Sequence, residues 1–233
     1  MSLLTIVQNA CRRVGLAVPS SVASSSDAIA VQMLGILNEV GNALVKRHDW
    51  SALTKEGTFT TVAAETQVAA VTTTFTDFDR YKPDTMFNRT TVKKVFGPLD
   101  NTEWQAQKAI TVTPAYSYFR FRGGAILFLP TPTAGESVYF EYIARNWCQS
   151  SGGTAQSAFA ADTDTGILGE ELLTLGLVTS WQQAKGLEYG ESFRRFEMRL
   201  AQESAQEGAK PTLDMGSRPW RLPEGNIPEG SWS

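Results

Sequence analysis

Helical patterns at both ends of the chain enclose a long strand-rich stretch, and this order limits the fold more than any single motif. In the early segment, apolar residues recur every three or four positions: Ile29, Met33, Ile36, Leu37, Val40 and Leu44. This spacing puts them on one face of an amphipathic helix. From Thr58 to Ile143 the chain is rich in Thr, Val, Phe and Tyr, and helical periodicity returns near Ile167. The order predicts a helical domain interrupted by a β module.

The composition is that of a globular protein with a slight excess of acidic groups. The 233 residues could form one large or two small domains, and 42% of them are hydrophobic. A net charge of −3 argues against a surface built throughout to attract nucleic acid, although a local basic patch remains open. No apolar run reaches membrane-spanning length, and the sequence does not begin with a signal-peptide pattern. We therefore expect neither a transmembrane helix nor a membrane partner.

The residue types needed for catalysis are scattered. Cys11 and Cys148 form no metal or redox motif, and they fit buried thiols in a reducing compartment better than a disulfide. His48 is the only histidine, and with Asp49 it could be half of an acid–base pair, but the sequence places no nucleophile nearby. We expect no catalytic residue and no enzymatic activity.

A group of carboxylates before the returning helices raises the hypothesis of a metal site. Asp162, Asp164, Glu170 and Glu171 lie close in sequence, but they lack the alternating spacing and the terminal Glu of a calcium loop. Helix capping by the two aspartates and first-turn charge from the two glutamates explain them better. We expect no metal ion and no cofactor.

Two helices open the chain, and each ends in basic residues. The first is expected to run to Val14 and to end at Gly15. The second ends at Lys46 and Arg47, whose charges complement the helix dipole. Helix-end electrostatics is the simpler explanation of this pair, and contact with a phosphate or an acidic partner is the functional one. Trp50 is expected to be a core anchor between the helix end and the β module.

The central region predicts several short strands. Candidate strands, judged by their β-branched and aromatic content, cover residues 58–62, 67–71, 91–96, 118–122, 125–129 and 138–143. Gly123 and Gly124 can adopt positive φ, which makes the fourth and fifth strands a hairpin. We expect the last three strands to form an antiparallel meander.

Aromatic and basic residues offer two possible binding surfaces in this region. Arg120 and Arg122 share a strand face with Tyr118, which could bind single-stranded nucleic acid. The acidic balance of the chain favours an ordinary exposed face instead. Trp104, Tyr116 and Tyr118 could form a stacking platform, as in a β-rich carbohydrate- or protein-binding module.

Beyond the β region the chain returns to helix and then loses its periodicity. A tract rich in Ser, Gly and Ala at 149–161 is typical of a linker, and two helices follow up to Gly208. The next segment is broken by prolines but retains apolar side chains that need burial. We expect an extended arm that docks on a neighbouring subunit or partner, or on its own domain. Its candidate contact residues are Leu213, Met215, Trp220, Arg221, Leu222, Ile227 and Trp232.

These expectations describe an α+β chain. Residues 1–53 and 162–208 form an antiparallel helical bundle from the N- and C-terminal helices. Residues 54–148 form an inserted antiparallel β-rich domain, and residues 149–161 are a linker. Residues 209–233 form the extended C-terminal arm.

With this order of elements, the chain resembles the head-to-tail adaptor, or connector, proteins of tailed bacteriophages, including the tail tubular protein A type. The resemblance covers essentially the full chain. It rests on the early helix pair, the loose C-terminal arm and residues 47–50, 127–135, 138–142 and 181–186.

The resemblance implies a structural virion protein that forms a ring of twelve copies beneath the portal protein of a DNA-filled capsid. Such a ring extends the DNA channel, lets DNA pass without sequence-specific binding and provides a platform for the tail or nozzle protein. C-terminal arms would engage the portal. The protein would be made in the host cytoplasm and located in the head–tail neck of the virion, where it serves assembly and DNA ejection. The alternative is a carbohydrate- or protein-binding module of a phage tail.

Overall fold

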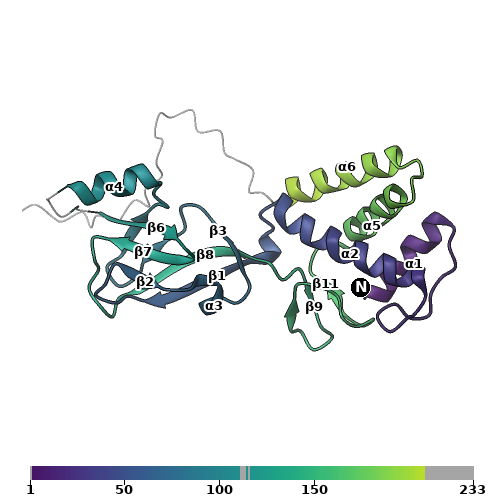
Figure 1. The fold of residues 1–233 in the computed structure, drawn as a ribbon, viewed down its shortest axis with the longest axis horizontal. Coiled ribbons are helices and arrows are strands. Elements are labelled where there is room, and N and C mark those ends of the chain that lie inside the picture. Colours follow the sequence, from purple (N-terminus) through teal and green to yellow (C-terminus); the bar gives the residue numbers. More distant parts are fainter. Residues whose placement is uncertain (1, 111–113, 115, 208–233) are drawn as a thin grey trace, which may run out of the picture.

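The computed structural model describes residues 2–110, 114 and 116–207, and Figure 1 shows them as two lobes along the long axis. One lobe is helical and the other is a twisted sheet, which confirms the expected α+β class. The helical lobe contains the four longest helices of the described residues: α1 (Leu3–Val14), α2 (Ala28–Arg47), α5 (Glu170–Ala184) and α6 (Gly190–Glu207). Since α1 and α2 precede the sheet and α5 and α6 follow it, segments far apart in sequence close this lobe.

The first helix begins and ends as its sequence predicts. The hydroxyl of Ser2 accepts a hydrogen bond from the backbone N–H of Thr5 at 3.4 Å. Gly15 ends α1 at φ 72°, in the left-handed region that favours glycine. The buried face of α1 packs on α5 and consists of Leu3, Ile6, Val7, Ala10 and Cys11.

α2 is the central helix of the helical lobe. It packs against α5, and its buried residues are Ala30, Met33, Leu37, Val40, Gly41, Leu44 and Val45. In the described part of the chain, α2 is also the one helix that is long and apolar enough to cross a membrane, by length and composition alone. No transmembrane helix is expected from the sequence, because polar residues scattered along α2 break its apolar run. Core helices of globular proteins have the same length and composition.

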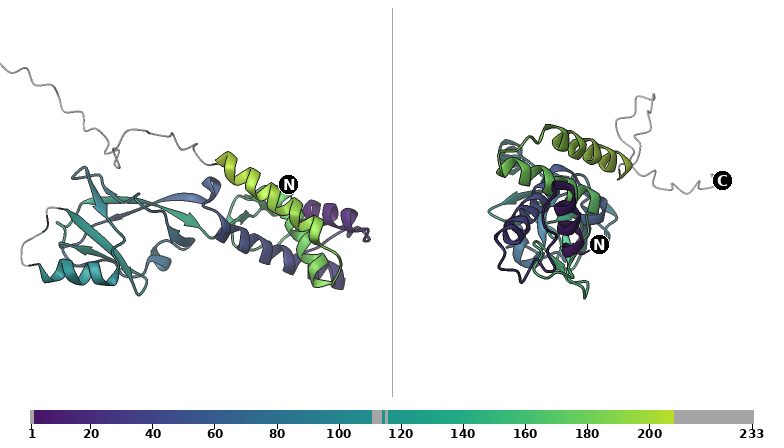
Figure 2. Two further views of the ribbon diagram at one scale, coloured as in Figure 1. Left: turned by 90° about the horizontal axis from the view of Figure 1, so that it is seen from above. Right: turned by 90° about the vertical axis from the view of Figure 1, so that its right-hand side faces the viewer.

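The two returning helices differ in burial. α5 is buried on several sides, as its two adjacent apolar rows predict, and it approaches α2 closely: a Cβ at Gly176 would lie 2.6 Å from Val40 Cγ1. α6 is the outer layer of the lobe, and Figure 2 shows it above α5. Phe196 is its one buried residue, so most of the α6 surface is open.

The β lobe is built around an eight-stranded sheet. The strand order is β1-β8-β4-β5-β6-β7-β2, and β3 pairs with β8 off this path. The strands are β1 (Thr54–Thr60), β2 (Thr66–Val68), β3 (Phe78–Tyr81), β4 (Phe87–Asn88), β5 (Lys93–Phe96), β6 (Ser117–Arg122), β7 (Ala125–Leu129) and β8 (Ser137–Ala144). The short helical segments of this part are η1 (Ser51–Leu53), α3 (Val71–Thr74) and α4 (Asn101–Ala109).

The predicted hairpin is confirmed, but the predicted meander is wrong. β6 and β7 pair antiparallel across Gly123 and Gly124, whose φ angles are 60° and 78°. β8 does not continue from β7, because it pairs with β1, β3 and β4. β5 pairs parallel with β6, so the sheet departs from the purely antiparallel prediction. Both departures involve partners that no local turn signal can specify.

Residues predicted to be a linker contribute regular structure next to the helices. β9 (Cys148–Gln149) pairs with β10 (Ala155–Gln156) and β11 (Thr165–Gly166) in a three-stranded sheet. Phe159 is buried, and its ring packs edge-on against Trp147 with centroids 4.9 Å apart. This segment therefore helps to enclose the helical core.

Asp162 and Asp164 are not helix caps, contrary to the prediction. Each carboxylate accepts two hydrogen bonds of 2.8–2.9 Å from loop backbone. The donors are the N–H groups of Val22, Ala23, Ala160 and Ala161. α5 instead starts after Gly169 without a side-chain cap. The two aspartates therefore fix loops on the helical lobe, because each satisfies two backbone donors at once.

Two hydrophobic cores lie in the two lobes. The helical core includes residues of all four long helices, together with Trp50, which is buried as expected for an anchor. The sheet core includes Met86, Phe119, Phe128 and Phe140. Ile143, near the end of β8, belongs to the helical core, so β8 extends to the helical lobe. The domain boundaries given above stay predictions.

Candidate functional site

The junction between the lobes is held by charged groups around the end of α2. Arg80 on β3 donates to Asp49 Oδ1 from Nε at 2.8 Å and from Nη2 at 2.6 Å. Its guanidinium also donates to the backbone carbonyls of Val45 at 2.9 Å and His48 at 2.8 Å. These carbonyls lie at the C-terminal end of α2, where a helix has unpaired acceptors and a partial negative charge. One side chain of the sheet therefore caps a helix of the other lobe.

The two basic residues singled out in the sequence belong to this junction. Lys46 forms an ion pair with Asp79, which also accepts a hydrogen bond from Arg80 at 2.9 Å. Arg47 forms an ion pair with Glu197 on α6, and its guanidinium carbon lies 5.4 Å from the centroid of the Phe196 ring. Lys46 and Arg47 thus bind within the chain. Their predicted contact with an external partner stays a prediction.

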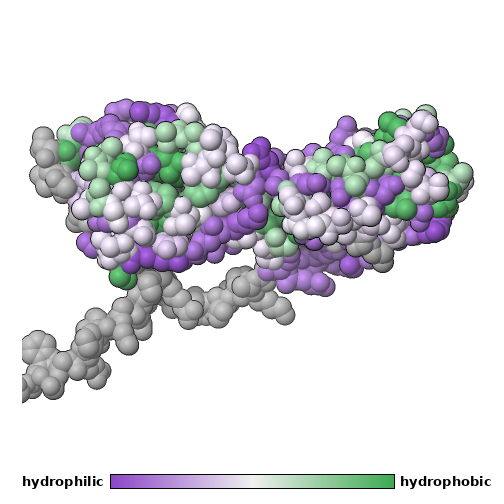
Figure 3. Space-filling view, turned by 90° about the horizontal axis from the view of Figure 1, so that it is seen from below, coloured by the Kyte–Doolittle hydropathy of each residue, from purple (hydrophilic) through white to green (hydrophobic). Residues whose placement is uncertain are grey.

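The end of α6 closes the other side of the junction. The Glu207 carboxylate accepts a hydrogen bond from the backbone N–H of Ser51 at 3.0 Å. It also lies 3.8 Å from His48 Nε2. The band between the lobes is correspondingly hydrophilic in Figure 3. We define this set of residues, from Val45 to Asp49 with Asp79, Arg80, Glu197 and Glu207, as the lobe junction.

Loss of Arg80 should loosen the lobe junction. We expect Arg80→Ala to reduce the free energy of unfolding, because it removes several charged hydrogen bonds. The loss should be only about 1–2 kcal/mol, because these bonds are partly exposed to solvent. Backbone amides in the last turn of α2 should exchange hydrogen faster. The measurements are thermal melting and hydrogen exchange followed by mass spectrometry.

The matched control is Arg89→Ala. Arg89 pairs with Glu56 at 2.6 Å and lies 3.6 Å from the centroid of the Tyr139 ring, so all of its partners are in the sheet. This change should leave exchange at the end of α2 unaltered. Equal exchange profiles for the two variants would show that Arg80 does not hold the junction.

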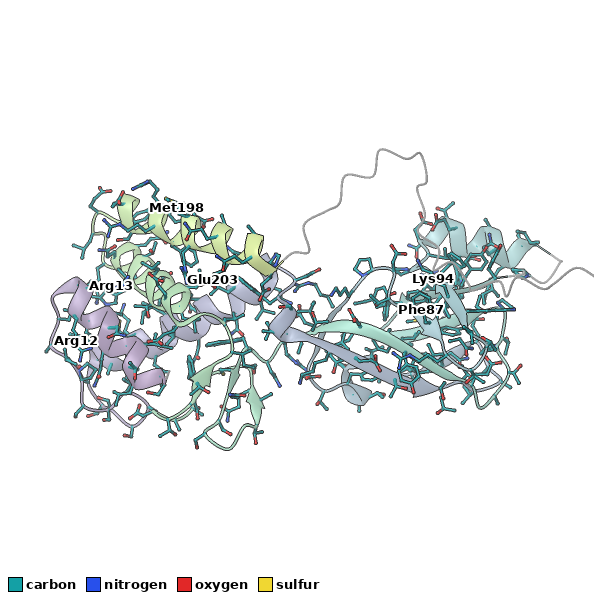
Figure 4. All side chains as sticks on the ribbon, turned by 180° about the vertical axis from the view of Figure 1, so that it is seen from behind. Arg12, Arg13, Phe87, Lys94, Met198 and Glu203 are labelled. Carbon is teal, nitrogen blue, oxygen red and sulfur yellow. The ribbon has the colours of Figure 1, made fainter. Side chains whose placement is uncertain are left out.

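A second feature is a groove between α1, α5 and α6. It has two adjoining compartments of about 530 Å³ and about 630 Å³, which share Arg13 and Glu171. Figure 4 shows Arg12 and Arg13 on α1 and Met198 on α6. The larger compartment is lined by Asn9, Arg12, Arg13, Glu170, Glu171 and Thr174. The smaller is lined by Arg13, Glu171, Leu175, Val178, Gln182, Ser192, Arg195, Met198, Arg199 and Gln202. We call the two compartments together the helical groove.

The cations of the helical groove differ in how they are paired. Arg195 binds Glu191 at 2.9 Å, and Arg199 binds Glu203 at 2.8 Å. Among residues 2–110, 114 and 116–207, Arg13 has neither an ion pair nor a side-chain hydrogen bond, and Arg12 bonds only to its neighbour Asn9. The groove therefore offers unpaired positive charge on its α1 wall.

The aromatic platform considered in the sequence does not exist as predicted. Trp104 is the one buried residue of α4 and is fully buried, so its ring cannot stack on a ligand. Arg120, expected on an exposed strand face, is buried as well, and it donates to Asn101 at 2.6 Å. Its guanidinium carbon lies 5.6 Å from the centroid of the Trp104 ring. Packing of α4 on the sheet explains both corrections, because the sequence does not show which strand face a short helix covers.

The cysteines and the histidine considered for catalysis make packing contacts in the structure. Cys11 and Cys148 are both free and buried, as predicted, and burial together with the nearby Asp164 raises the pKa of the Cys148 thiol to about 12. His48 packs against Trp50 with ring centroids 4.9 Å apart. Within the ranges that the structure covers, no group of three or more His, Cys, Asp or Glu could hold a metal ion.

The predicted contact residues of the C-terminal arm cannot be placed. They are Leu213, Met215, Trp220, Arg221, Leu222, Ile227 and Trp232, and all lie outside the described residues. Sequence reasoning did not single out Arg80, because an isolated arginine in a strand pattern carries no signal of its helix-capping role. It also missed the helical groove, whose walls come from both ends of the described chain.

Comparison with known proteins identifies a family. A family model described as SU10 adaptor protein matches residues 1–221. The match covers both lobes and part of the segment beyond α6. A search of curated proteins gives no match.

Proposed function

The chain belongs to the SU10 adaptor protein family, and on this premise we propose that it is a head-to-tail adaptor that docks beneath the phage portal. The family is one of structural phage proteins, which supports a protein that acts by binding and not by turnover. The observation that carries the proposal is a family match that extends over both lobes. An adaptor of this kind is a component of the virion neck. It is synthesised in the host cytoplasm and joins the virion during assembly.

We further propose a ring of twelve copies that extends the DNA channel and presents a platform to a tail or nozzle protein. The net charge of −3 supports passage of DNA without tight binding, because a strongly basic lumen would retain phosphate groups. The two-lobed shape supports a bridging role, since each lobe offers a separate surface. Hydrogen bonds and ion pairs of the lobe junction link these surfaces, which supports a subunit that aligns two partners.

Contact with the portal is assigned to the segment beyond α6. Residues 209–233 carry Trp220, whose large apolar side chain is of the kind that anchors protein interfaces. The described part of the chain supports a separate arm, because α6 ends on the outer layer of the helical lobe. The helical and β-rich units proposed here are residues 1–53 with 162–208 and residues 54–148.

Assembly on portal tests the proposed function. Light scattering of the isolated protein should show mainly monomer, because α6 exposes mostly polar and charged side chains that favour templated association. Addition of the portal protein should produce rings that electron microscopy can count, with twelve copies expected. A stable dimer that does not respond to portal would contradict the proposal. Bovine serum albumin in place of portal is the control for crowding.

A further inference from the structure

The segment beyond α6 contains a short tandem repeat. Residues 222–226 read Leu-Pro-Glu-Gly-Asn and residues 227–231 read Ile-Pro-Glu-Gly-Ser. Each unit therefore carries one aliphatic residue, one proline and one glutamate in the same order. Proline favours the extended polyproline II conformation, which loses little entropy when a peptide docks in a groove. The repeat contains Glu224 and Glu229 and no basic residue, so it is acidic throughout.

The helical groove matches this repeat in form. Its two compartments share Arg13 and Glu171, so they form one continuous channel along α5. The α5 residues that line the groove extend from Glu170 to Gln182, which is about 18 Å at the rise of an α-helix. Equivalent residues of the two units are five positions apart, which is about 15 Å in polyproline II. Two equivalent residues of the repeat can therefore both lie along the groove.

The groove also matches the repeat in chemistry. Arg12 and Arg13 lie on the α1 wall without an ion-pair partner among the residues that the structure covers, and Glu170 and Glu171 line the same compartment from α5. A carboxylate that reaches either guanidinium would form a charge-assisted hydrogen bond. On the opposite wall Met198 is 50% exposed, next to Leu175 and Val178, and this apolar surface suits Leu222 or Ile227.

We propose that residues 222–231 bind in the helical groove of the same chain. The described chain leaves α6 at Glu207, only five residues beyond Gln202 on the groove rim. The 14 intervening residues can span up to about 45 Å, which is ample for this path. A tethered segment has an effective concentration in the millimolar range, so it outcompetes the repeat of another monomer in dilute solution. Residues 208–221, including Trp220, remain available for the portal contact proposed above.

Photo-crosslinking of the full-length protein tests this docking. Benzoylphenylalanine in place of Met198 should crosslink, in the monomer band, to the peptide that contains residues 222–231. Val31 on α2 is 53% exposed and lies outside the groove, so the same probe at Val31 should give no such product. Portal protein is absent from the experiment, and its outcome is therefore independent of the proposed function.

Charge exchange makes the test specific. The double variant Arg12→Glu and Arg13→Glu should reduce the crosslink at Met198 at least fivefold. Adding Glu224→Arg and Glu229→Arg to that variant should restore it, while melting temperatures verify that every variant is folded. The proposal fails if the crosslink is unaffected by the arginine changes, if Val31 gives an equal yield, or if Met198 captures a different segment. It also fails if the product appears only in a dimer band, which would assign the groove to a neighbouring copy.

Discussion

Alanine at position 41 should destabilise the helical lobe by about 2–3 kcal/mol, although alanine is the better helix former. An added Cβ at Gly41 would lie 2.2 Å from Cζ2 of Trp147 and 2.3 Å from its Cε2. The indole cannot yield easily. Its Nε1 donates to Asn42 Oδ1 at 3.0 Å and to Ser157 O at 2.9 Å, and its ring packs on Phe159. Steric overlap therefore outweighs the helix propensity gained, which is about 1 kcal/mol.

Gly35→Ala is the matched control on the same helix. A Cβ at Gly35 meets no atom within 4 Å, so only the propensity effect remains. This variant should be more stable by about 0.5–1 kcal/mol. Chemical denaturation of both variants gives the comparison, and opposite signs are expected. If Gly41→Ala also stabilises the protein, that result would contradict the close packing of α2 against Trp147.

A double variant identifies the cause of the expected loss. Trp147→Phe removes the Cζ2 and Cη2 atoms that would clash, at its own cost in packing and hydrogen bonds. In that background Gly41→Ala should lose most of its destabilising effect, which a double-mutant cycle measures. An unchanged cost would place the strain elsewhere on α2.

Deletion of residues 209–233 should leave both lobes folded but strongly weaken attachment to portal. The described lobes have separate cores that contain no residue beyond Leu200, which is why folding should survive. Trp220→Ala should reproduce part of the loss, at about 2 kcal/mol or more in binding free energy if the indole is a central anchor. The measurements are melting temperature and portal binding of each variant.

The arm predictions have clear alternatives. Unfolding of the truncated chain would make the arm a structural strap on its own subunit. Portal binding that is unchanged after truncation would place the interface elsewhere. Trp232→Ala removes the other indole of the arm. Trp232 lies outside residues 208–221, which stay free when residues 222–231 dock in the helical groove, so this change should have the smaller effect.

Local signals in the sequence predicted the local structure well. The end of α1 at Gly15 and the turn at Gly123 and Gly124 each depend on residues adjacent in the chain, and both are as expected. The burial of Cys11 and Cys148 was also expected from their lack of a motif. Such features follow from backbone conformation and composition, which a single sequence contains.

Long-range features could not be predicted in the same way. β8 has apolar residues on both of its faces, so its sequence is compatible with several partner strands. Its pairing with β1 is determined by how all the strands of the sheet pack together. The sequence suggested Trp104 as part of a ligand platform, but its ring is buried where α4 packs on the sheet. Arg80 became informative only when β3 met the end of α2. Each of these roles depends on contacts between residues that are distant in sequence.

The division of the helical lobe between early and late segments has a consequence during synthesis. The ribosome releases α1 and α2 first, but α5, which covers their apolar faces, begins only at Glu170. Roughly 120 residues separate Arg47 from α5, so at 5–20 residues per second α2 waits for about 6–24 s. All strands of the large sheet emerge within that interval. The nascent chain therefore completes its sheet while the apolar face of α2 is still uncovered. During this interval that face is the main surface that chaperones would need to cover.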